Sequence, residues 1–285
     1  MAYSPYDWRQ TLQEKADYVE DRLRVGSPVI GISCRDGILL LTVRQSVQHK
    51  LYEIYDRLAF GGLGNPSDLE ALRQASVDFC HAEGYQHSPE DVSIQRVVGF
   101  ALSPVLKRGF ADPLRTPLVI LGLFAQLGER PEDDLFYKLN YDGDFALQHH
   151  YGGIAGTREA EAQLERILKD ALGLKEPRRA LAWEKALPQA LQAWVMARWQ
   201  VRQGSEPSKG EAGERGPSAS EPVKEKGSSE MTHLPSEKER ERLLAEELRQ
   251  GSVEAVLLER ETPRTQRFRP LSEEELAPFL PTKED

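Results

Sequence analysis

Cysteine and long apolar runs are scarce in this chain of 285 residues, and each absence excludes a class of protein. The two cysteines, Cys34 and Cys80, are too few for a disulfide framework and lack C-x-x-C spacing. A reducing, cytoplasmic compartment is therefore the simplest interpretation. No apolar run approaches the roughly 20 residues of a membrane-spanning helix. The first residues also lack the basic-then-apolar order of a secretory signal peptide.

Positive charge and ligand clusters are sparse as well. The 37 lysines and arginines are outnumbered by 46 acidic residues, and the net charge of −9 argues against nucleic acid or an anionic membrane as a partner. His49 has no Cys, His or acidic partner at zinc-ligand spacing, and the adjacent His149 and His150 would point to opposite faces of a strand. The glycines at 61, 62 and 64 lack the lysine of a phosphate-binding loop. We expect no metal and no cofactor.

The stretch from residue 26 to residue 64 organises the chain. Residues 28–34 and 37–43 are apolar runs joined by Arg35 and Asp36, which predicts a hairpin. A second pair of runs, residues 51–55 and 58–62, is rich in aromatic and branched side chains. We expect these four strands to make one antiparallel sheet that is covered on both faces.

Helices are predicted before and after this sheet. Ser4 and Pro5 indicate the start of an amphipathic helix that Gly26 ends. Asn65 caps a second helix that ends near Gly84. A capping signal at Ser88 predicts a third helix, which we expect Pro104 to bend. The second and third helices would cover one face of the sheet.

Strand patterns then return at residues 117–127, 135–141 and 145–149, which predicts a second sheet. Two more helices follow, one capped by Thr157 and one with apolar positions from Leu187 to Trp199. The order of strands, two helices, strands and two helices predicts an α+β fold. Its architecture is a four-layer αββα sandwich of two antiparallel sheets, preceded by an N-terminal helix.

Composition changes at residue 203. Residues 203–235 are nearly all Gly, Ser, Pro, Glu and Lys, which predicts a disordered segment. Beyond it, residues 239–249 favour a charged helix and residues 253–258 an apolar strand, followed by a second strand at 267–271 and a short helix capped by Ser272. We interpret 203–235 as an insertion inside the domain, because closure entropy grows only slowly with loop length.

The motifs of the first sheet resemble a known family. G-S-x-V-x-G-I, G-I-L-L and H-K-L-Y-E-I-Y-D-R, in this order, resemble proteasome core-particle subunits, which have the N-terminal-nucleophile (Ntn) hydrolase fold. K-L-Y-E-I-Y-D-R-L-A-F-G-G-L-G is most similar to the α-type subunit of bacterial proteasomes. The resemblance divides the chain into a gate segment and helix (1–26), the αββα domain (27–202), the insertion (203–235) and a C-terminal part (236–285) that completes the domain.

The resemblance implies a non-catalytic α-type subunit of the 20S core particle. Such a subunit forms a homo-heptameric outer ring, gates substrate entry to catalytic β-type subunits, and docks the C-terminal tails of a hexameric regulatory ATPase. Lys50 matches the lysine that pairs with a tail carboxylate, a task that suits a compact ammonium group. Gly26, Gly64 and Asn65 would shape that pocket. The implied gate consists of Met1, Ala2, Tyr3, Ser4, Pro5 and Tyr6.

Catalysis in the family needs a free N-terminal threonine, an aspartate and a lysine. The matching positions here are Ser27, Val43 and Lys50, so only the lysine is present in the family's own form. Ser27 is followed by Pro28 and preceded by the predicted N-terminal helix, which favours a structural role. The alternative is a divergent self-compartmentalising Ntn peptidase that uses Ser27 after cleavage of the preceding bond. A non-proteasomal scaffold on the same fold is a third possibility.

Overall fold

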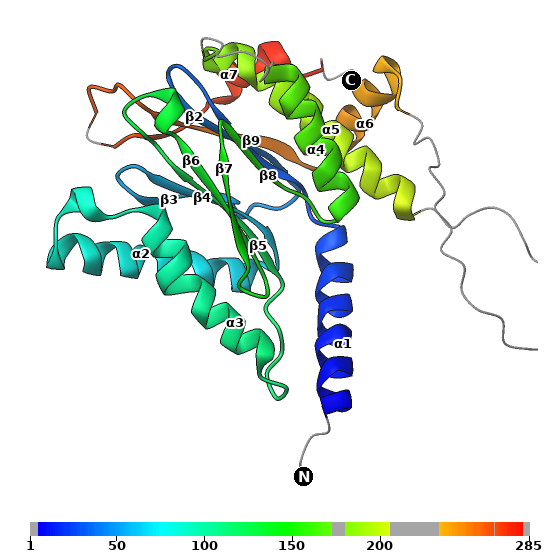
Figure 1. Ribbon diagram of the computed structural model, residues 1–285. Helices are drawn as coiled ribbons and strands as arrows, with labels where there is room; N and C mark the ends of the chain where they lie inside the picture. The colour runs from blue at the N-terminus through cyan, green and yellow to red at the C-terminus, as the bar shows by residue number, and fades with distance from the viewer. Residues whose placement is uncertain (1–4, 173–179, 206–233, 265, 282–285) are drawn as a thin grey trace, which may run out of the picture.

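The computed structural model describes residues 5–172, 180–205, 234–264 and 266–281. Two antiparallel five-stranded sheets make up its centre (Figure 1). The first sheet has the order β10-β9-β2-β1-β8 and comprises β1 (Val29–Ser33), β2 (Gly37–Arg44), β8 (Tyr151–Ile154), β9 (Ser252–Glu259) and β10 (Phe268–Pro270). The second sheet has the order β3-β4-β5-β6-β7 and comprises β3 (Leu51–Tyr55), β4 (Leu58–Gly64), β5 (Ile120–Gln126), β6 (Leu135–Asn140) and β7 (Phe145–His149).

The expectation that the first four strands share one sheet is wrong. β1 and β2 pair as the predicted hairpin, but β3 and β4 lie in the second sheet. The link between β2 and β3 spans six residues, 45–50. Stacked sheets lie about 10 Å apart, so this link is long enough to cross from the first sheet to the second. The free edge of β2 pairs instead with β9 along its whole length, from Gly37 to Arg44.

Strand β8 was not predicted from the sequence. Its two central glycines, Gly152 and Gly153, favour a loop by composition, yet β8 pairs with β1 and closes that edge of the first sheet. A Cβ atom at Gly152 would lie 2.8 Å from Phe136, and one at Gly153 would lie 2.3 Å from Leu164. The glycines are therefore required by close packing on both faces of the strand.

Helices cover the outer face of each sheet, which confirms the four-layer αββα sandwich (Figure 1). The helices on the second sheet are α2 (Pro66–Gln86), the π-helical η2 (Arg96–Leu102) and α3 (Ser103–Ala111), with the short turns η1 (Pro89–Asp91) and η3 (Pro131–Asp133) nearby. Those on the first sheet are α4 (Arg158–Leu172), α5 (Trp183–Ser205), α6 (Glu237–Gln250) and α7 (Glu273–Leu276), followed by the turn η4 (Ala277–Phe279).

The third predicted helix differs from expectation. Ser88 caps only the 3-10 turn η1, through a 3.4 Å bond from the Glu90 amide, and the longer helix begins at Ile94. Its residues 96–102 form a π segment directly before Pro104. Proline cannot donate a hydrogen bond, and its ring clashes with the carbonyl four residues earlier. The wider π turn accommodates the proline, and the helix continues through it to Ala111, while the bend expected at Pro104 stays a prediction.

Three apolar cores hold the layers together. The core between the sheets includes four fully buried side chains, Val29, Leu63, Leu123 and Phe136. A second core, around Trp194, joins the first sheet to α4, α5 and α6. A third joins α2 and η2 to the second sheet. Each large apolar side chain buried in this way contributes about 1.5–3 kcal/mol.

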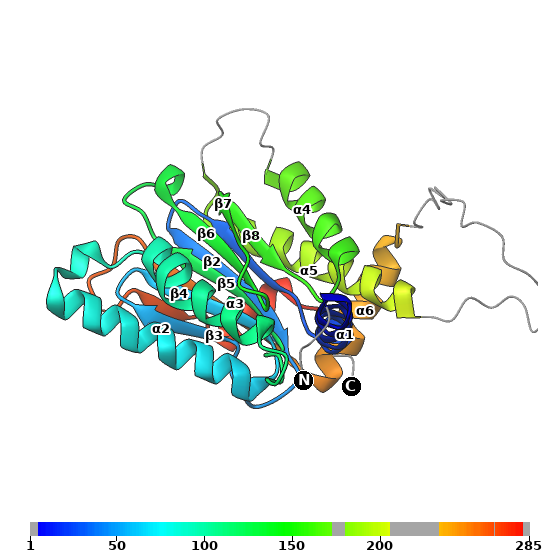
Figure 2. The same ribbon diagram turned by 60° about the horizontal axis from the view of Figure 1, so that its bottom comes forward.

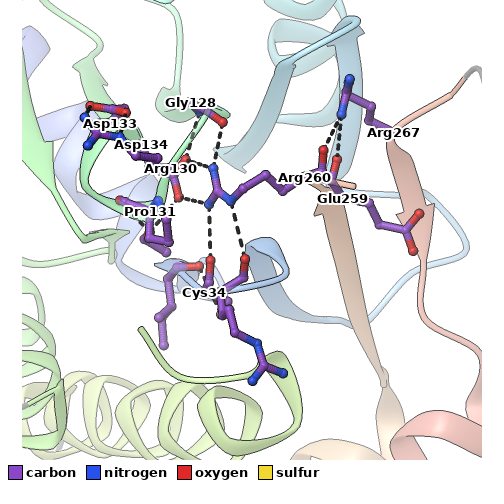
Figure 3. Close-up of polar contacts among 12 residues, drawn as sticks. Cys34, Gly128, Arg130, Pro131, Asp133, Asp134, Glu259, Arg260 and Arg267 are labelled. Carbon is purple, nitrogen blue, oxygen red and sulfur yellow. Dashed lines mark hydrogen bonds and ion pairs between the residues drawn. The ribbon is translucent and has the colours of Figure 1, made fainter. Parts of the chain in front are cut away.

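A buried ion pair also fastens the two sheets to each other (Figure 3). Asp134, directly before β6, is fully buried. Its carboxylate accepts hydrogen bonds from both terminal nitrogens of Arg260, at 2.7 and 3.0 Å. The same carboxylate accepts the Ser33 hydroxyl and the Gly128 amide, while Arg260 also donates to the carbonyls of Gly128 and Cys34. Every polar atom of the pair is used, so we interpret it as structural.

Helix α1 (Pro5–Arg24) stands beside the sandwich and is seen nearly end-on in Figure 2. Its C-terminal half is anchored, because Val19 and Leu23 are buried in the core between the sheets. Farther toward the N-terminus, the Lys15 ammonium donates to the carbonyl of Asp112 beyond the end of α3, at 2.5 Å. Lysine suits this place, since carbonyl groups are left unpaired where a helix ends.

The C-terminal part contributes β9 and β10 to the first sheet. Helix α6 begins with a capping box formed by Ser236 and Glu239, and a second capping box of Ser272 and Glu275 begins α7. Helix α5 continues to Ser205, so the segment between α5 and α6 begins later than the predicted residue 203. Residues 206–233 lie outside the described part of the chain, and their disorder stays a prediction.

Candidate functional site

Ser27 links the end of α1 to β1. Its side chain is 7% exposed, accepts a 3.1 Å hydrogen bond from the indole N–H of Trp194, and lies 3.4 Å from the hydroxyl of Thr42. Its amide nitrogen is bonded to Gly26, whose own N–H closes α1 on the carbonyl of Leu23 at 2.9 Å. The Ser27 hydroxyl therefore accepts the hydrogen bond of a buried indole N–H. The nitrogen of Ser27 is a peptide amide in this chain and cannot act as a general base.

Of the three positions that match the family's catalytic residues, only Lys50 has an ionisable side chain. Val43 is fully buried and pairs with Val253 in the first sheet, where it can supply no charge. Lys50 begins the β3 side of the second sheet, where its carbonyl accepts the Gly62 amide at 3.1 Å. The partners of the Ser27 hydroxyl are Thr42 and Trp194, and Lys50 is not among them.

The Lys50 side chain is partly buried at the end of the link that leads into β3. Within the described residues, its ammonium group has no hydrogen bond and no ion pair. Burial lowers the pKa of Lys50 to about 8, while the charge of Glu254 raises this pKa and that of Arg198 lowers it. A charged group that is partly desolvated and unpaired is well suited to bind an external anion.

The three residues expected to shape the pocket around Lys50 lie close to β4. A Cβ atom at Gly26 would lie 2.5 Å from the Leu63 side chain, so the end of α1 packs directly on this strand. Gly64 has a φ of +139°, and a Cβ there would come within 2.0 Å of the Val119 carbonyl. Only glycine fits there. Asn65 caps α2 by accepting the Ser67 amide at 3.2 Å, so its side chain serves the helix.

An acidic residue that was not predicted from the sequence, Glu254 on β9, lies at this site. It is 9% exposed, and its carboxylate accepts the backbone amides of Lys50 and Leu51 at 3.0 and 3.2 Å. His49 Nδ1 lies 3.1 Å from the same carboxylate. A signal was present in the sequence: Glu254 is an acidic residue inside an otherwise apolar strand, between Val253 and Ala255.

A charged network supports the same region from α5 and α6. Arg198 donates to the carbonyl of Val25 at 3.1 Å and to Glu247 at 2.9 Å, and Arg202 also donates to Glu247 at 2.9 Å. Burial raises the pKa of Glu247, but the charge of Arg198 and hydrogen bonds from both arginines outweigh it, so the net pKa is lowered. The network ties the end of α1 to the helices that flank the insertion.

The residues of the predicted gate lie at and before the start of α1. Pro5 and Tyr6 form the first turn of α1, and Met1, Ala2, Tyr3 and Ser4 lie outside the described residues. A gate at this end of α1 stays a prediction.

Among the described residues, no group of three or more His, Cys, Asp or Glu side chains is placed to hold a metal ion. In the same part of the chain, no helix is long and apolar enough to cross a membrane. The His149 and His150 rings are 6.4 Å apart between centroids, at the turn from β7 to β8.

Comparisons with known proteins give related sequences. No family model matches this chain. The chain is similar to the "Proteasome subunit alpha" of Paenarthrobacter aurescens, with 32% identity over 203 residues that cover 66% of this chain and 82% of the relative. For the protein of the same name from Acidimicrobium ferrooxidans the identity is 30% over 168 residues, covering 59% and 72%.

For other relatives the similar region covers a smaller share of the protein's length. The proteasome subunit alpha of Actinosynnema mirum is 32% identical over 154 residues, which cover 54% of this chain and 58% of that protein. The chain thus spans less than two thirds of this relative's length, whereas it spans more than four fifths of the Paenarthrobacter protein.

Proposed function

Because this chain belongs to the family of proteasome α subunits, we propose that it is a non-catalytic, ring-forming subunit of a proteasome core particle. In this proposal seven copies close into an outer ring in the cytoplasm through heterologous contacts, and this ring stacks on catalytic β-type subunits. The N-terminal segment ahead of α1 gates the axial entrance. The role of the subunit is to control access to proteolysis that its partners perform.

One contrast carries the proposal. The position that matches the family's nucleophile, Ser27, is buried and accepts a hydrogen bond from Trp194, whereas the partly buried Lys50 ammonium is unpaired among the described residues. The chemistry available to the described residues is therefore recognition of an anion, not attack on an amide. We assign Lys50 to the C-terminal carboxylate of a hexameric regulatory ATPase, with Gly26 and the turn at Gly64 and Asn65 shaping the pocket.

The alternative, a peptidase that uses Ser27 after cleavage of the Gly26–Ser27 bond, conflicts with packing. Such cleavage would remove α1, and with it Val19 and Leu23, which are buried in the core between the sheets. Intact-mass measurement of the purified protein distinguishes the non-catalytic subunit from the peptidase, because only the peptidase requires a mature N-terminus at Ser27.

The purified protein alone is expected to show no hydrolysis of fluorogenic peptides. Its Ser27 hydroxyl is occupied, and Val43 replaces the aspartate that catalysis requires. The measurement is fluorescence release at high protein concentration by the wild-type chain and by Ser27→Ala. Hydrolysis that is present in the wild type and lost in Ser27→Ala would establish the peptidase alternative.

Lys50→Ala is expected to weaken activation by the ATPase partner without affecting the fold. Loss of one charge-assisted contact costs about 1.5–3 kcal/mol per pocket, or roughly 10- to 150-fold in the affinity of a single tail. The measurement is peptide turnover by assembled α/β particles against ATPase concentration. Lys138→Ala on β6 is a control of the same chemistry, since Lys138 pairs with Glu161 away from the pocket.

Docking should also depend on pH. Because the pKa of Lys50 is lowered to about 8, carboxylate binding should be full below pH 8 and decline as pH rises through it. Unchanged activation in Lys50→Ala would remove the docking role.

Deleting Met1 to Tyr6 is expected to raise peptide entry into an assembled α/β particle several-fold without changing the chemistry of cleavage. The deleted residues end in the first turn of α1, far from its anchored half, so the helix should be retained. Turnover of a short peptide by full-length and shortened particles measures the effect. Equal rates would show that these residues do not gate the entrance.

A further inference from the structure

The Glu254 side chain bridges the two sheets beside the proposed docking pocket. Glu254 belongs to β9 in the first sheet. Its carboxylate accepts hydrogen bonds from the amides of Lys50, the last residue before β3, and Leu51, the first residue of β3 in the second sheet. Strand β3 is an edge strand, so these first amides have no neighbouring strand on their outer side. Two successive backbone N–H groups that converge on one carboxylate form a small anion-binding nest, filled here by the chain's own side chain.

We infer that Glu254 is a positioning residue for Lys50: its carboxylate fixes the backbone of residues 50 and 51 and maintains the positive charge of the Lys50 side chain. The inference rests on the proposed docking role of Lys50 and adds the residue that prepares it. Holding the backbone fixes the point from which the lysine side chain extends. A pre-ordered pocket loses less entropy when a tail binds.

Glu254 also acts on the lysine through its charge. It lies within electrostatic range of the Lys50 ammonium and raises its pKa, but the two groups do not form an ion pair. The other charged group that acts on this ammonium is Arg198 of α5, which is itself engaged by Glu247 of α6. On its own segment the neighbouring titratable residue is His49, which contacts Glu254. The lysine is thus kept charged and yet left free to bind.

This arrangement selects the chemistry of the ligand. An unpaired ammonium in a partly desolvated site favours a full negative charge, so a free C-terminal carboxylate should bind and the corresponding carboxamide should not. The nest cannot take the ligand's carboxylate itself, because Glu254 already occupies it. Lys50 is therefore the expected contact for the incoming charge.

The first experiment measures the pocket without any ligand. Hydrogen exchange at the Lys50 and Leu51 amides and the pH dependence of Lys50 acylation, followed by mass spectrometry, are compared in wild type, Glu254→Gln and Glu53→Gln. Glu53→Gln makes the same substitution on β3, at a side chain that contacts Gln266 and not the amides of residues 50 and 51, so it is a matched control.

In Glu254→Gln, exchange at these two amides should rise about tenfold, and the midpoint of Lys50 acylation should fall by about one pH unit. Arg198→Gln should move that midpoint in the opposite direction, since Arg198 lowers the pKa of Lys50. If Glu254→Gln does not fold, the wild-type exchange rates and the Arg198→Gln midpoint still decide. Unprotected amides at residues 50 and 51, or midpoints equal to wild type in the folded variants, would overturn the inference.

The second experiment adds a synthetic eight-residue peptide in two forms, one with a free C-terminal carboxylic acid and one with a C-terminal carboxamide. A midpoint one unit lower reduces the charged fraction at pH 8 from about one half to about one tenth. Glu254→Gln should therefore bind the acid about fivefold more weakly at pH 8 and nearly normally at pH 6.5. If neither peptide binds wild type while the exchange and acylation results hold, the docking proposal fails and the positioning by Glu254 stands.

Discussion

A chain that ends at Gln203 should fail to fold. It lacks β9, which pairs with β2 over eight residues from Gly37 to Arg44, and so leaves that strand's backbone groups unpaired. It also lacks four consecutive side chains of β9 that are at most 2% exposed, at residues 255–258. Each of the larger ones contributes about 1.5–3 kcal/mol, so their sum rivals the whole stability of a typical domain. Circular dichroism, thermal unfolding and size-exclusion chromatography measure the effect.

The matched control removes much of the same sequence but keeps the sheet. Replacing residues 206–233 with a Gly/Ser linker of about twelve residues, whose r.m.s. span is roughly 20 Å, should leave folding and assembly nearly unchanged. Helices α5 and α6 remain, together with the bonds from Arg198 and Arg202 to Glu247. A truncated chain that stays soluble and unfolds cooperatively would show instead that everything after Gln203 is a dispensable tail.

Arg260→Met should destabilise the fold by about 3–5 kcal/mol, because it leaves the fully buried Asp134 carboxylate without its counter-ion. For a chain of this size such a loss lowers the melting temperature by roughly 10 °C. The surrounding groups cannot compensate, since Ser33 and the Gly128 amide already donate to the same carboxylate. Urea unfolding of the variant gives the free energy directly.

Arg264→Met is the control for this prediction. Arg264 lies four residues away and pairs with Glu259 while about half exposed, so its loss should cost less than about 1 kcal/mol. A double variant with Asp134→Asn and Arg260→Met should be more stable than the sum of the single effects, since it removes the orphaned charge. Equal costs for Arg260→Met and Arg264→Met would mean that the buried pair does not fasten the sheets.

Folding of the C-terminal part depends on strand pairing and on the Asp134–Arg260 contact, which join segments more than 100 residues apart. Function in the proposed role depends on one small region, where α1 ends against β4 and β4 pairs with the start of β3. A variant at Lys50 can therefore lose docking while retaining full stability.

Local patterns in the sequence determined most of the elements. The apolar runs around Arg35 and Asp36 predicted the hairpin of β1 and β2, and capping signals at Asn65, Thr157 and Ser272 mark observed helix starts. The order of these elements was enough to predict four layers. Such features depend on residues within a few positions of one another, which is why one sequence reveals them.

Only the tertiary structure decided how the strands were distributed and what surrounds Lys50. The transfer of β3 and β4 to the second sheet and the inclusion of the Gly-rich β8 depend on which partner edges are free, and periodicity carries no information about edges. The lysine and its supporting carboxylate at Glu254 lie 204 residues apart in sequence. Lys50 could be predicted because it belongs to a local motif, but the burial that lowers its pKa and the carboxylate that holds it exist only once the two sheets have packed together.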